Sequence, residues 1–191
     1  MSEKTIRWGV LSCANIAAKA VIPGILAAGN ARLQAIASRD ASKLSGFMAR
    51  FKAETGHVGY QALLDDPAVD AVYIPLPNHL HREWVLKAAA AGKHVLCEKP
   101  LGLNPTETAE MHAACATHGV VLMEAFAYRH SPVTRKVKEL VDGGAIGRLR
   151  HIEAGFSFLL DNPGNVRQFK EMGGGATYDI GCYTLDIIRH L

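Results

Sequence analysis

The sequence lacks a long apolar run: none approaches the roughly 20 residues that a helix needs to cross a bilayer. It also shows no signal peptide pattern, because the polar start, residues 1–4, leads straight into an apolar strand pattern. We therefore expect a cytoplasmic protein with no membrane partner.

The sequence also lacks a large net charge and closely spaced cysteines. The formal net charge is only +3 at pH 7 and the charges are dispersed, so no nucleic-acid partner is expected. The four cysteines are far apart and include no Cys-x-x-Cys pair; they are Cys13, Cys97, Cys115 and Cys182. This spacing favours reduced thiols over a disulfide framework.

The first part of the chain, residues 1–125, predicts a doubly wound parallel α/β sheet of the Rossmann type, since strand patterns alternate with helix patterns of crossover length. The strands are expected at residues 6–11, 33–38, near 58, at 71–74, 95–97 and 120–123. The helices are expected at residues 16–28, 41–55, 62–64, 80–91 and 104–119, the first kinked or split at Pro23. The predicted strand order is 3-2-1-4-5-6.

The second part, residues 126–191, predicts the start of an incomplete α+β domain. A helix is expected at residues 133–141, and a last helix begins at about residue 176. Between them, residues 148–158 alternate polar and apolar side chains, which predicts a long antiparallel strand packed on one face. With 191 residues, the chain is long enough for one domain and part or all of a second.

The turn after the first strand lies where a dinucleotide fold holds pyrophosphate with glycines and a helix amino terminus. Serine and alanine stand here in place of the usual glycines. Small residues can also serve only close helix packing, so this motif alone leaves both interpretations open. The candidate cofactor contacts in this turn are Ser12, Cys13, Ala14, Asn15 and Ile16.

The end of the second strand bears on the choice of cofactor. An acidic residue there would bind the ribose 2′-hydroxyl, whereas Ser38 and Arg39 offer a hydroxyl and a guanidinium suited to a 2′-phosphate. Asp40 is expected to cap the next helix, and Lys43 joins the candidate cofactor contacts. NADP is therefore preferred over NAD; the alternative is an exposed arginine in a turn.

The loop after the fourth strand contains two prolines, which force an extended path across the strand ends where nicotinamide ribose would lie. The candidate contacts here are Pro75, Leu76, Pro77, Asn78 and His81. His79 and His81 are two residues apart with no further ligand cluster, so no metal site is expected. An equally favoured role for His81 is to cap or orient the loop.

The apolar strand 95–97 stops at Glu98, Lys99 and Pro100. Ligands of open α/β sheets bind beyond the carboxyl ends of such buried strands. Lys99 is therefore a candidate for chemistry, with Glu98 beside it as a cofactor contact. The alternative is a solvated lysine at a strand end.

A second chemical segment runs from Gly173 to Tyr183. Asp179 and Tyr183 are four residues apart and would project from one helix face, while the glycines permit close backbone approach to a flat group. A tyrosine is a poor acid–base group at neutral pH unless a cation favours its phenolate, and Lys99 would supply that cation. The alternative is a core tyrosine and a helix-capping aspartate.

These features together resemble the glucose-fructose oxidoreductase/inositol dehydrogenase (Gfo/Idh/MocA) family, and most of all its branch with dimeric dihydrodiol dehydrogenase. The resemblance covers the whole chain and implies an NAD(P)-binding Rossmann domain followed by an α+β domain on a large open sheet. The matching motifs are Trp8-Gly9-Val10, Glu98-Lys99-Pro100, Met123-Glu124-Ala125-Phe126 with Tyr128-Arg129, and Gly173-Gly174-Gly175 through Tyr183.

The resemblance also implies roles for single residues. Lys99 matches the lysine that holds nicotinamide ribose and supports catalysis, Tyr183 the general acid/base, and Asp179 the acidic residue on the substrate side. Arg129 lies in a segment that commonly reaches toward the cofactor. Family chains are longer, so most of the open sheet, which supplies a pocket wall and the oligomer surface, is expected to be missing here.

The prediction is an NAD(P)-dependent oxidoreductase that moves a hydride between nicotinamide and a carbinol carbon of a sugar, polyol or diol. Its catalytic residues would be Lys99, Tyr183 and Asp179, and a homo-oligomer is expected where the open sheet is complete. Two alternatives are a non-catalytic NADP-binding remnant or regulatory module without a complete substrate pocket, and a structural interaction domain that uses the exposed half-sheet after Arg148.

Overall fold

The computed structural model describes residues 5–191, so the expectation of a leaderless start, which rests on residues 1–4, lies outside the described residues. The chain divides into two compact units; the first ends at Glu124 and the second begins at Ala125. Each unit is described by itself below. Among the described residues, no helix has the length and apolar character to span a membrane.

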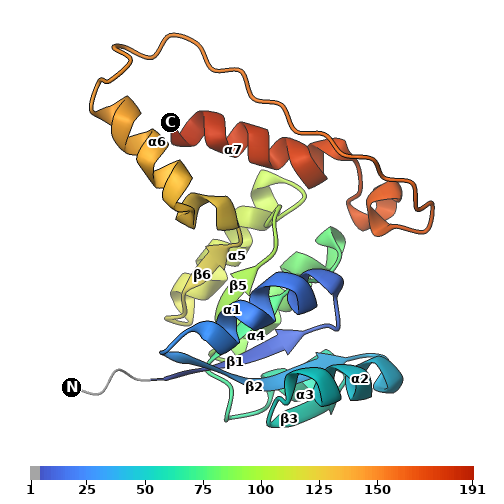
Figure 1. The fold of residues 1–191 in the computed structure, drawn as a ribbon. Helices are drawn as coiled ribbons and strands as arrows, with labels where there is room; N and C mark the ends of the chain where they lie inside the picture. The colour runs from blue at the N-terminus through green and yellow to red at the C-terminus, as the bar shows by residue number, and fades with distance from the viewer. Residues whose placement is uncertain (1–4) are drawn as a thin grey trace. The chain divides into compact units, whose positions relative to one another are not determined.

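The first unit is an α/β unit built on a six-stranded sheet in the order β3-β2-β1-β4-β5-β6, as the sequence predicts (Figure 1). Every pairing between neighbouring strands is parallel. The strands are β1 (Ile6–Leu11), β2 (Ala31–Ser38), β3 (Thr55–Val58), β4 (Ala71–Ile74), β5 (His94–Cys97) and β6 (Leu122–Glu124).

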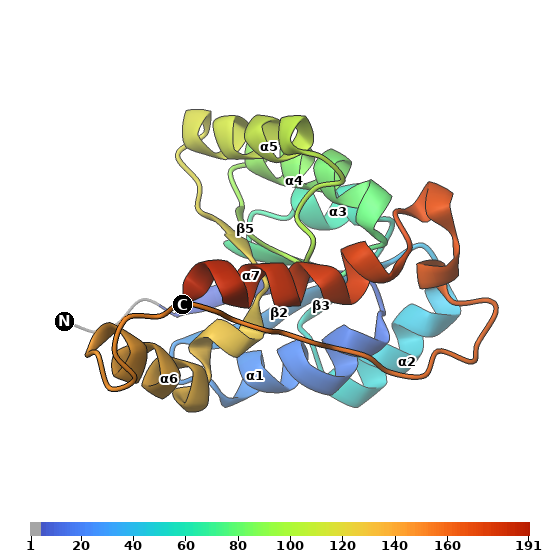
Figure 2. The ribbon, with the colours of Figure 1, turned by 90° about the horizontal axis from the view of Figure 1, so that it is seen from above.

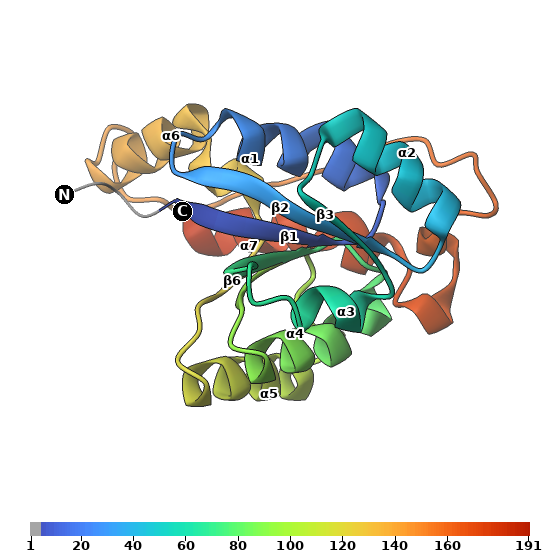
Figure 3. The ribbon, with the colours of Figure 1, turned by 90° about the horizontal axis from the view of Figure 1, so that it is seen from below.

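Helices cover both faces of this sheet, with α1 and α2 on one face and α3, α4 and α5 on the other (Figures 2 and 3). Each face has its own core: Ile22 and Leu44 pack on one side, and Val85 and Met111 on the other. The helices are α1 (Ile22–Ala27), α2 (Ala41–Phe51), α3 (Tyr60–Leu64), α4 (His81–Ala90) and α5 (Pro105–Thr117).

Local chemistry explains how these helices begin. A π-helical turn, Ala17–Val21, precedes α1, and Pro23 lies in the first turn of α1, so the predicted split of this helix is confirmed. Asp40 caps α2 by accepting from the backbone N–H groups of Ser42 and Lys43, at 2.9 and 3.1 Å.

One helix end differs from the prediction. The helix expected at residues 41–55 ends at Phe51, because Lys52 adopts the left-handed conformation with a φ of 54° and breaks the helical path. The chain then enters β3, where residues 55–58 pair with β2. The remaining predicted boundaries in this unit shift by at most two residues.

The second unit contains α6 (Pro132–Asp142) and α7 (Cys182–His190). A 3-10 turn, Ala127–His130, precedes α6, and a π-helical turn, Thr177–Gly181, precedes α7. The connection between the two helices holds two further 3-10 turns, Val166–Gln168 and Lys170–Met172.

The long strand predicted at residues 148–158 is wrong. This segment has neither helix nor strand and runs as an irregular chain in Figure 1. Alternating side chains favour an extended backbone, but a strand also needs a neighbour that accepts and donates its ladder hydrogen bonds. No other strand is present in this unit within the described residues, so the segment forms no ladder.

Candidate cofactor and active site

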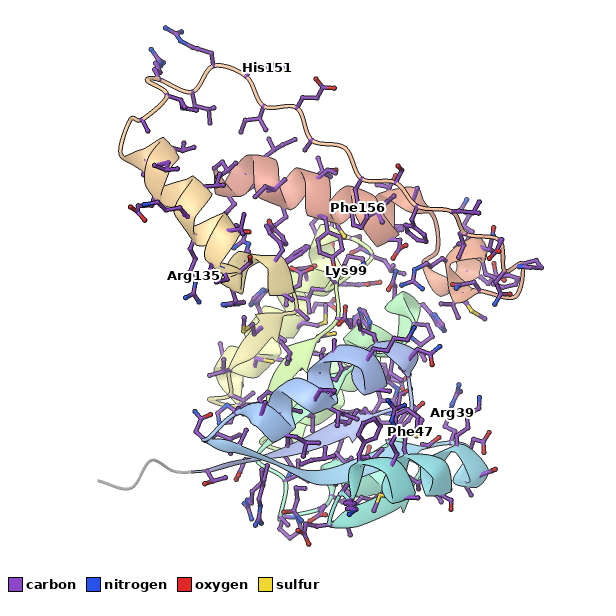
Figure 4. The ribbon with its side chains drawn as sticks, viewed as in Figure 1. Arg39, Phe47, Lys99, Arg135, His151 and Phe156 are labelled. Carbon is purple, nitrogen blue, oxygen red and sulfur yellow. The ribbon has the colours of Figure 1, made fainter. Side chains whose placement is uncertain are left out.

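The candidate residues of the first unit lie at the carboxyl ends of its parallel strands. The strand order reverses between β1 and β4, and ligands of doubly wound sheets bind at such a switch point. The loops after β1, β2, β4 and β5 therefore open onto one edge of the sheet. Figure 4 labels Arg39, just beyond β2, and Lys99, just beyond β5.

The turn after β1 keeps a glycine-like backbone without a glycine. Ser12 has a φ of 139°, a conformation that residues with a Cβ rarely adopt and that costs on the order of 1–3 kcal/mol. Asn15 and Ile16, at the start of the following helical stretch, are exposed. A dinucleotide contact at this turn stays a prediction, with helix packing alone as its alternative.

Cys13, in the first turn, lies near the end of β2, since Ser38 acts on the pKa of its thiol. Burial raises the pKa of the Cys13 thiol, and Ser38 partly opposes that shift. Ser38 is buried, and its hydroxyl oxygen accepts from the N–H of Asp40 at 3.1 Å. Cys13, which follows β1, and Ser38, the last residue of β2, therefore lie close together at the carboxyl edge of the sheet.

Two exposed cations flank the start of α2. Arg39 directs its guanidinium to within 6.0 Å of the centre of the Tyr60 ring, and Lys43 lies in the first helical turn. Between them, the Asp40 carboxylate is engaged by backbone N–H groups of α2. This end of β2 thus presents two cations, and one carboxylate oxygen of Asp40 is used to cap α2.

His81 joins the loop after β4 to the loop after β5. It is fully buried, with Nε2 2.8 Å from the carbonyl oxygen of Leu76 and Nδ1 2.9 Å from that of Pro100. Burial lowers the pKa of His81, although its two carbonyl contacts oppose that shift, so at neutral pH the ring donates to one of the two carbonyl oxygens at a time. This placement supports the loop-orienting role over direct contact with a cofactor.

The turn that carries Lys99 is fixed before the lysine by Glu98, whose Oε1 accepts from the hydroxyl of Tyr73 at 2.6 Å. Tyr73 is itself fully buried in β4. The Lys99–Pro100 peptide bond is cis, and the carbonyl of Pro100 is the one that His81 contacts. Lys99 therefore projects from backbone that neighbouring elements hold in place.

After the lysine, the N–H of Leu101 donates to Oε1 of Glu124, the last residue of β6, at 2.8 Å. Sequence reasoning assigned no role to Tyr73 or Glu124. Glu124 carried a signal, because it is an acidic residue at the carboxyl end of a strand and part of a family motif. Tyr73 carried none, because its bond to Glu98 joins residues that are distant in sequence.

In the second unit, Tyr183 lies in the first turn of α7 and is surrounded by aromatic rings. The centroids of Phe126, Tyr128 and Phe156 are 5.5, 6.0 and 5.8 Å from the centroid of its ring. Phe156 comes from the irregular segment that precedes the glycines (Figure 4). These three rings pack against the Tyr183 ring. The position of its hydroxyl group is set by other groups.

Asp179 lies one turn before Tyr183 and forms an ion pair with Arg167, with 2.8 Å between Oδ1 and Nε. The backbone of Gly174 packs closely against that of Arg167. A Cβ on Gly174 would lie 2.6 Å from the carbonyl oxygen of Arg167. At Gly174 the close approach is therefore to the chain's own backbone. Sequence reasoning missed Arg167, because its partner is recognisable only once the loop is folded.

Arg129 is engaged with Asp186 of α7, with 2.8 Å between Nε and Oδ2, and Tyr128 donates to the same carboxylate. Although burial opposes it, these two partners hold the pKa of Asp186 below its usual value. Burial and Asp186 raise the pKa of Tyr128 to about 12, which keeps its hydroxyl a donor at neutral pH. The cofactor contact expected of Arg129 stays a prediction.

The pairing of Lys99 with Tyr183 would join the two units and also stays a prediction. Within residues 5–191, no three or more histidine, cysteine, aspartate or glutamate side chains are grouped so that they could hold a metal ion.

Comparison with known families accounts for both units. Residues 6–126 match the model described as an oxidoreductase family with an NAD-binding Rossmann fold, and residues 134–191 match the GFO/IDH/MocA C-terminal domain. D-xylose 1-dehydrogenase (NADP(+)) 2 of Haloferax volcanii is 43% identical over 183 residues, which are 95% of this chain and 56% of that protein. Trans-1,2-dihydrobenzene-1,2-diol dehydrogenase of Xenopus tropicalis is 34% identical over 183 residues, 95% and 55% of the two chains.

Among solved structures, KijD10, a 3-ketoreductase from Actinomadura kijaniata in complex with NADP and TDP-benzene, superposes with a TM-score of 0.89 at 41% identity. The match covers 94% of this chain and 55% of that one. Structures of KijD10 include variants in which a lysine is replaced by alanine or glutamate and a tyrosine by phenylalanine. The chain spans about half the length of the curated relatives it matches.

Proposed function

Because the chain belongs to the Gfo/Idh/MocA family of NAD-binding oxidoreductases, we propose that it binds NADP and transfers a hydride between the nicotinamide ring and a carbinol carbon of a sugar, polyol or diol. The observation that carries this proposal is the Lys99 turn. It lies at the carboxyl edge of the parallel sheet and is fixed by Tyr73, His81 and Glu124 from three neighbouring elements.

The residues of this edge fit a dinucleotide. The glycine-like backbone of Ser12 and the exposed start of the next helix suit a pyrophosphate. Arg39 and Lys43 suit a 2′-phosphate, while Oδ1 of Asp40 serves as the cap of α2. NADP is thus preferred over NAD, in line with the NADP named for the Haloferax dehydrogenase and the Actinomadura ketoreductase.

When bound, the cofactor supplies the hydride acceptor or donor of the reaction. Lys99 would hold the nicotinamide ribose and supply positive charge next to the reacting groups. Tyr183 would take the proton of the substrate hydroxyl during oxidation and return it during reduction. Asp179, held by Arg167, would orient the substrate hydroxyl.

The KijD10 variants support the choice of Lys99 and Tyr183. The substituted lysine and the substituted tyrosine of KijD10 are separated by the same number of residues as Lys99 and Tyr183 are here. At 41% identity over 94% of this chain, an equal separation is expected if the two pairs occupy corresponding positions.

The substrate class rests on the names of the relatives. They act on D-xylose, on a dTDP-linked deoxy sugar and on a cyclic diol, which all carry a hydroxyl or carbonyl on a ring or chain carbon next to another oxygenated carbon. A homo-oligomer is proposed where the open sheet is complete, and light scattering during gel filtration of a chain that includes that sheet measures it.

A fluorescence titration of the purified 191-residue chain with NADPH and NADH tests the cofactor, and turnover on a panel of sugars, polyols and diols tests the reaction. Tighter binding of NADPH than of NADH, with turnover on members of the panel, would support the proposal. Tight NADPH binding with no turnover would favour a binding module over an enzyme. Absence of binding to either cofactor would contradict the proposal.

A further inference from the structure

Glu124 closes the turn that carries Lys99. In the parallel pairing of β5 with β6, Cys97 lies opposite Glu124. The chain continues from Cys97 through Lys99 and returns, so that the N–H of Leu101 lies 2.8 Å from Oε1 of the same Glu124. The turn therefore begins and ends beside Glu124, and its far end, at Leu101, is hydrogen-bonded to that residue.

The far end of the turn is held firmly. The side chain of Leu101 is buried in the core that α4 and α5 cover, so its backbone cannot move without leaving that core. An N–H group in such a place loses a large part of its stabilisation when its acceptor is removed.

The carboxylates of Glu98 and Glu124 hold different parts of the Lys99 turn. Glu98 precedes the lysine and accepts from the Tyr73 hydroxyl, so it fixes the approach to the turn. Glu124 comes from the neighbouring strand and fixes the exit. Its bond is made through an oxygen atom that an amide would also offer, so the geometry needs the reach of the side chain more than its charge.

We propose that Glu124 is a positioning residue that acts through the N–H of Leu101 to hold Lys99 where the nicotinamide ribose binds. This inference rests on the proposed function, because it assigns the turn to the cofactor. In this role Glu124 does not touch the cofactor. It acts through the backbone of residues 99–101, because it binds the N–H of Leu101.

The chain offers a matched control in Glu107. Its Oε2 accepts from the N–H of Leu103 at 2.9 Å, so it makes the same kind of bond two residues further along the same connection. That bond belongs to the start of α5, where Asn104 accepts from the N–H of Glu107. Glu107 therefore supports a helix end and not the Lys99 turn.

The test is a fluorescence titration of the 191-residue chain with NADPH in five forms: wild type, Glu124→Gln, Glu124→Asp, Glu124→Ala and Glu107→Ala. We expect Glu124→Gln and Glu107→Ala to bind within about twofold of wild type, and Glu124→Asp and Glu124→Ala roughly tenfold more weakly. Glutamine keeps the acceptor and the reach, whereas aspartate keeps the charge and loses the reach.

Three results would overturn the proposal: wild-type affinity in Glu124→Ala, equal weakening in Glu107→Ala, or a loss in Glu124→Gln as large as in Glu124→Ala. The aspartate variant answers the same question should the alanine variant not fold.

Hydrogen exchange of the Leu101 amide without cofactor separates this inference from the proposed function. If wild type binds no NADPH, the proposed function fails and the exchange rate decides the inference alone. Faster exchange at Leu101 in Glu124→Ala and Glu124→Asp, but not in Glu124→Gln, would support it. Unchanged exchange at Leu101 in all three variants would overturn it.

Discussion

The two units of the chain place their candidate catalytic residues on different kinds of support. The first unit buries side chains on both faces of its sheet, and Lys99 stands on backbone fixed to those cores. In the second unit, only Phe126 and Gly173 are buried among residues 125–191. Tyr183 and Asp179 depend there on an aromatic cluster and on ion pairs made by Arg167 and Arg129.

This difference divides the proposed chemistry into two parts. Cofactor binding relies on a unit whose geometry is set by close packing, which tolerates little displacement. The proposed proton transfer relies on a unit held by an aromatic cluster and ion pairs, in which single side chains fix the positions of others. Substitutions should therefore separate the two functions.

The largest effect is expected at the two catalytic candidates. Tyr183→Phe removes the group that moves the proton, so turnover should fall at least about a hundredfold while NADPH affinity stays within about twofold. Lys99→Met should lower both turnover and NADPH affinity, because it removes the proposed ribose contact as well as a charge. Steady-state kinetics and fluorescence titration measure the two quantities.

Lys87→Met serves as the control for the lysine, since Lys87 is exposed and paired with Glu83. Full turnover in both Tyr183→Phe and Lys99→Met would contradict the assignment of these roles.

The next effect concerns stability and uses two isoleucines. Ile36 is completely buried in β2, and Ile36→Ala should lower the free energy of unfolding by about 2–5 kcal/mol. Ile146, in the second unit, is 66% exposed, and Ile146→Ala should change it by less than about 0.5 kcal/mol.

Denaturation followed by far-ultraviolet circular dichroism reads the loss of helix in both units, whereas the fluorescence of Trp8 and Trp84 reports on the first unit alone, because both tryptophans lie there. Equal losses in Ile36→Ala and Ile146→Ala would show that the contrast in packing between the units does not hold.

A third prediction concerns the cofactor's 2′-phosphate. Arg39→Ala removes one of two exposed cations at the start of α2, so NADPH should bind roughly tenfold more weakly and NADH as before. Arg50→Ala is the matched control, because Arg50 lies in the last turn of the same helix, over the Phe51 ring. The idea fails if Arg39→Ala weakens both cofactors equally or neither.

A smaller effect is expected in the polar ties of the second unit. Tyr128 has a pKa of about 12, raised by burial and by Asp186, so its contribution to stability is present below pH 10 and lost as the pH rises through about 12. Asp186 has a lowered pKa, so its contribution is present above about pH 3.8 and is lost as the pH falls below that value.

Asp186→Asn should therefore lower the pKa of Tyr128, which a spectrophotometric titration of phenolate absorbance measures against wild type. An unchanged titration curve would mean that Asp186 does not hold Tyr128 in solution.

The smallest effect concerns strain in the first turn. Ser12→Gly relieves a backbone conformation that suits glycine and should raise the free energy of unfolding by about 1 kcal/mol. Ser42→Gly, inside α2, should instead lower it by about 0.5 kcal/mol, because glycine is a poor helix former. A loss of stability in Ser12→Gly, measured by Trp8 fluorescence, would contradict the strained geometry.

The sequence predicted the first unit better than the second because its signals are local. Strand order follows from alternating strands and helices, and the caps at Asp40 and Asn104 follow from residue types next to the helices they start. The end of α2 at Lys52 was missed, because a left-handed lysine gives no signal of the kind that glycine gives.

The misses at the site and in the second unit come from contacts between distant residues. Glu124 reaches Leu101, and Asp186 reaches Arg129, through bonds that no spacing rule describes. The segment 148–158 shows the opposite case: its side-chain pattern favours a strand, but a strand forms only with a neighbour to pair with.

The central claim is that NADP binds at the carboxyl edge of the first unit. Hydrogen exchange of the 191-residue chain with and without NADPH tests it directly. We predict that NADPH slows exchange at the amides of residues 12–16, 38–43 and 98–101, and leaves residues 132–142 of α6 unchanged. Protection confined to other parts of the chain, or no protection at saturating NADPH, would contradict it.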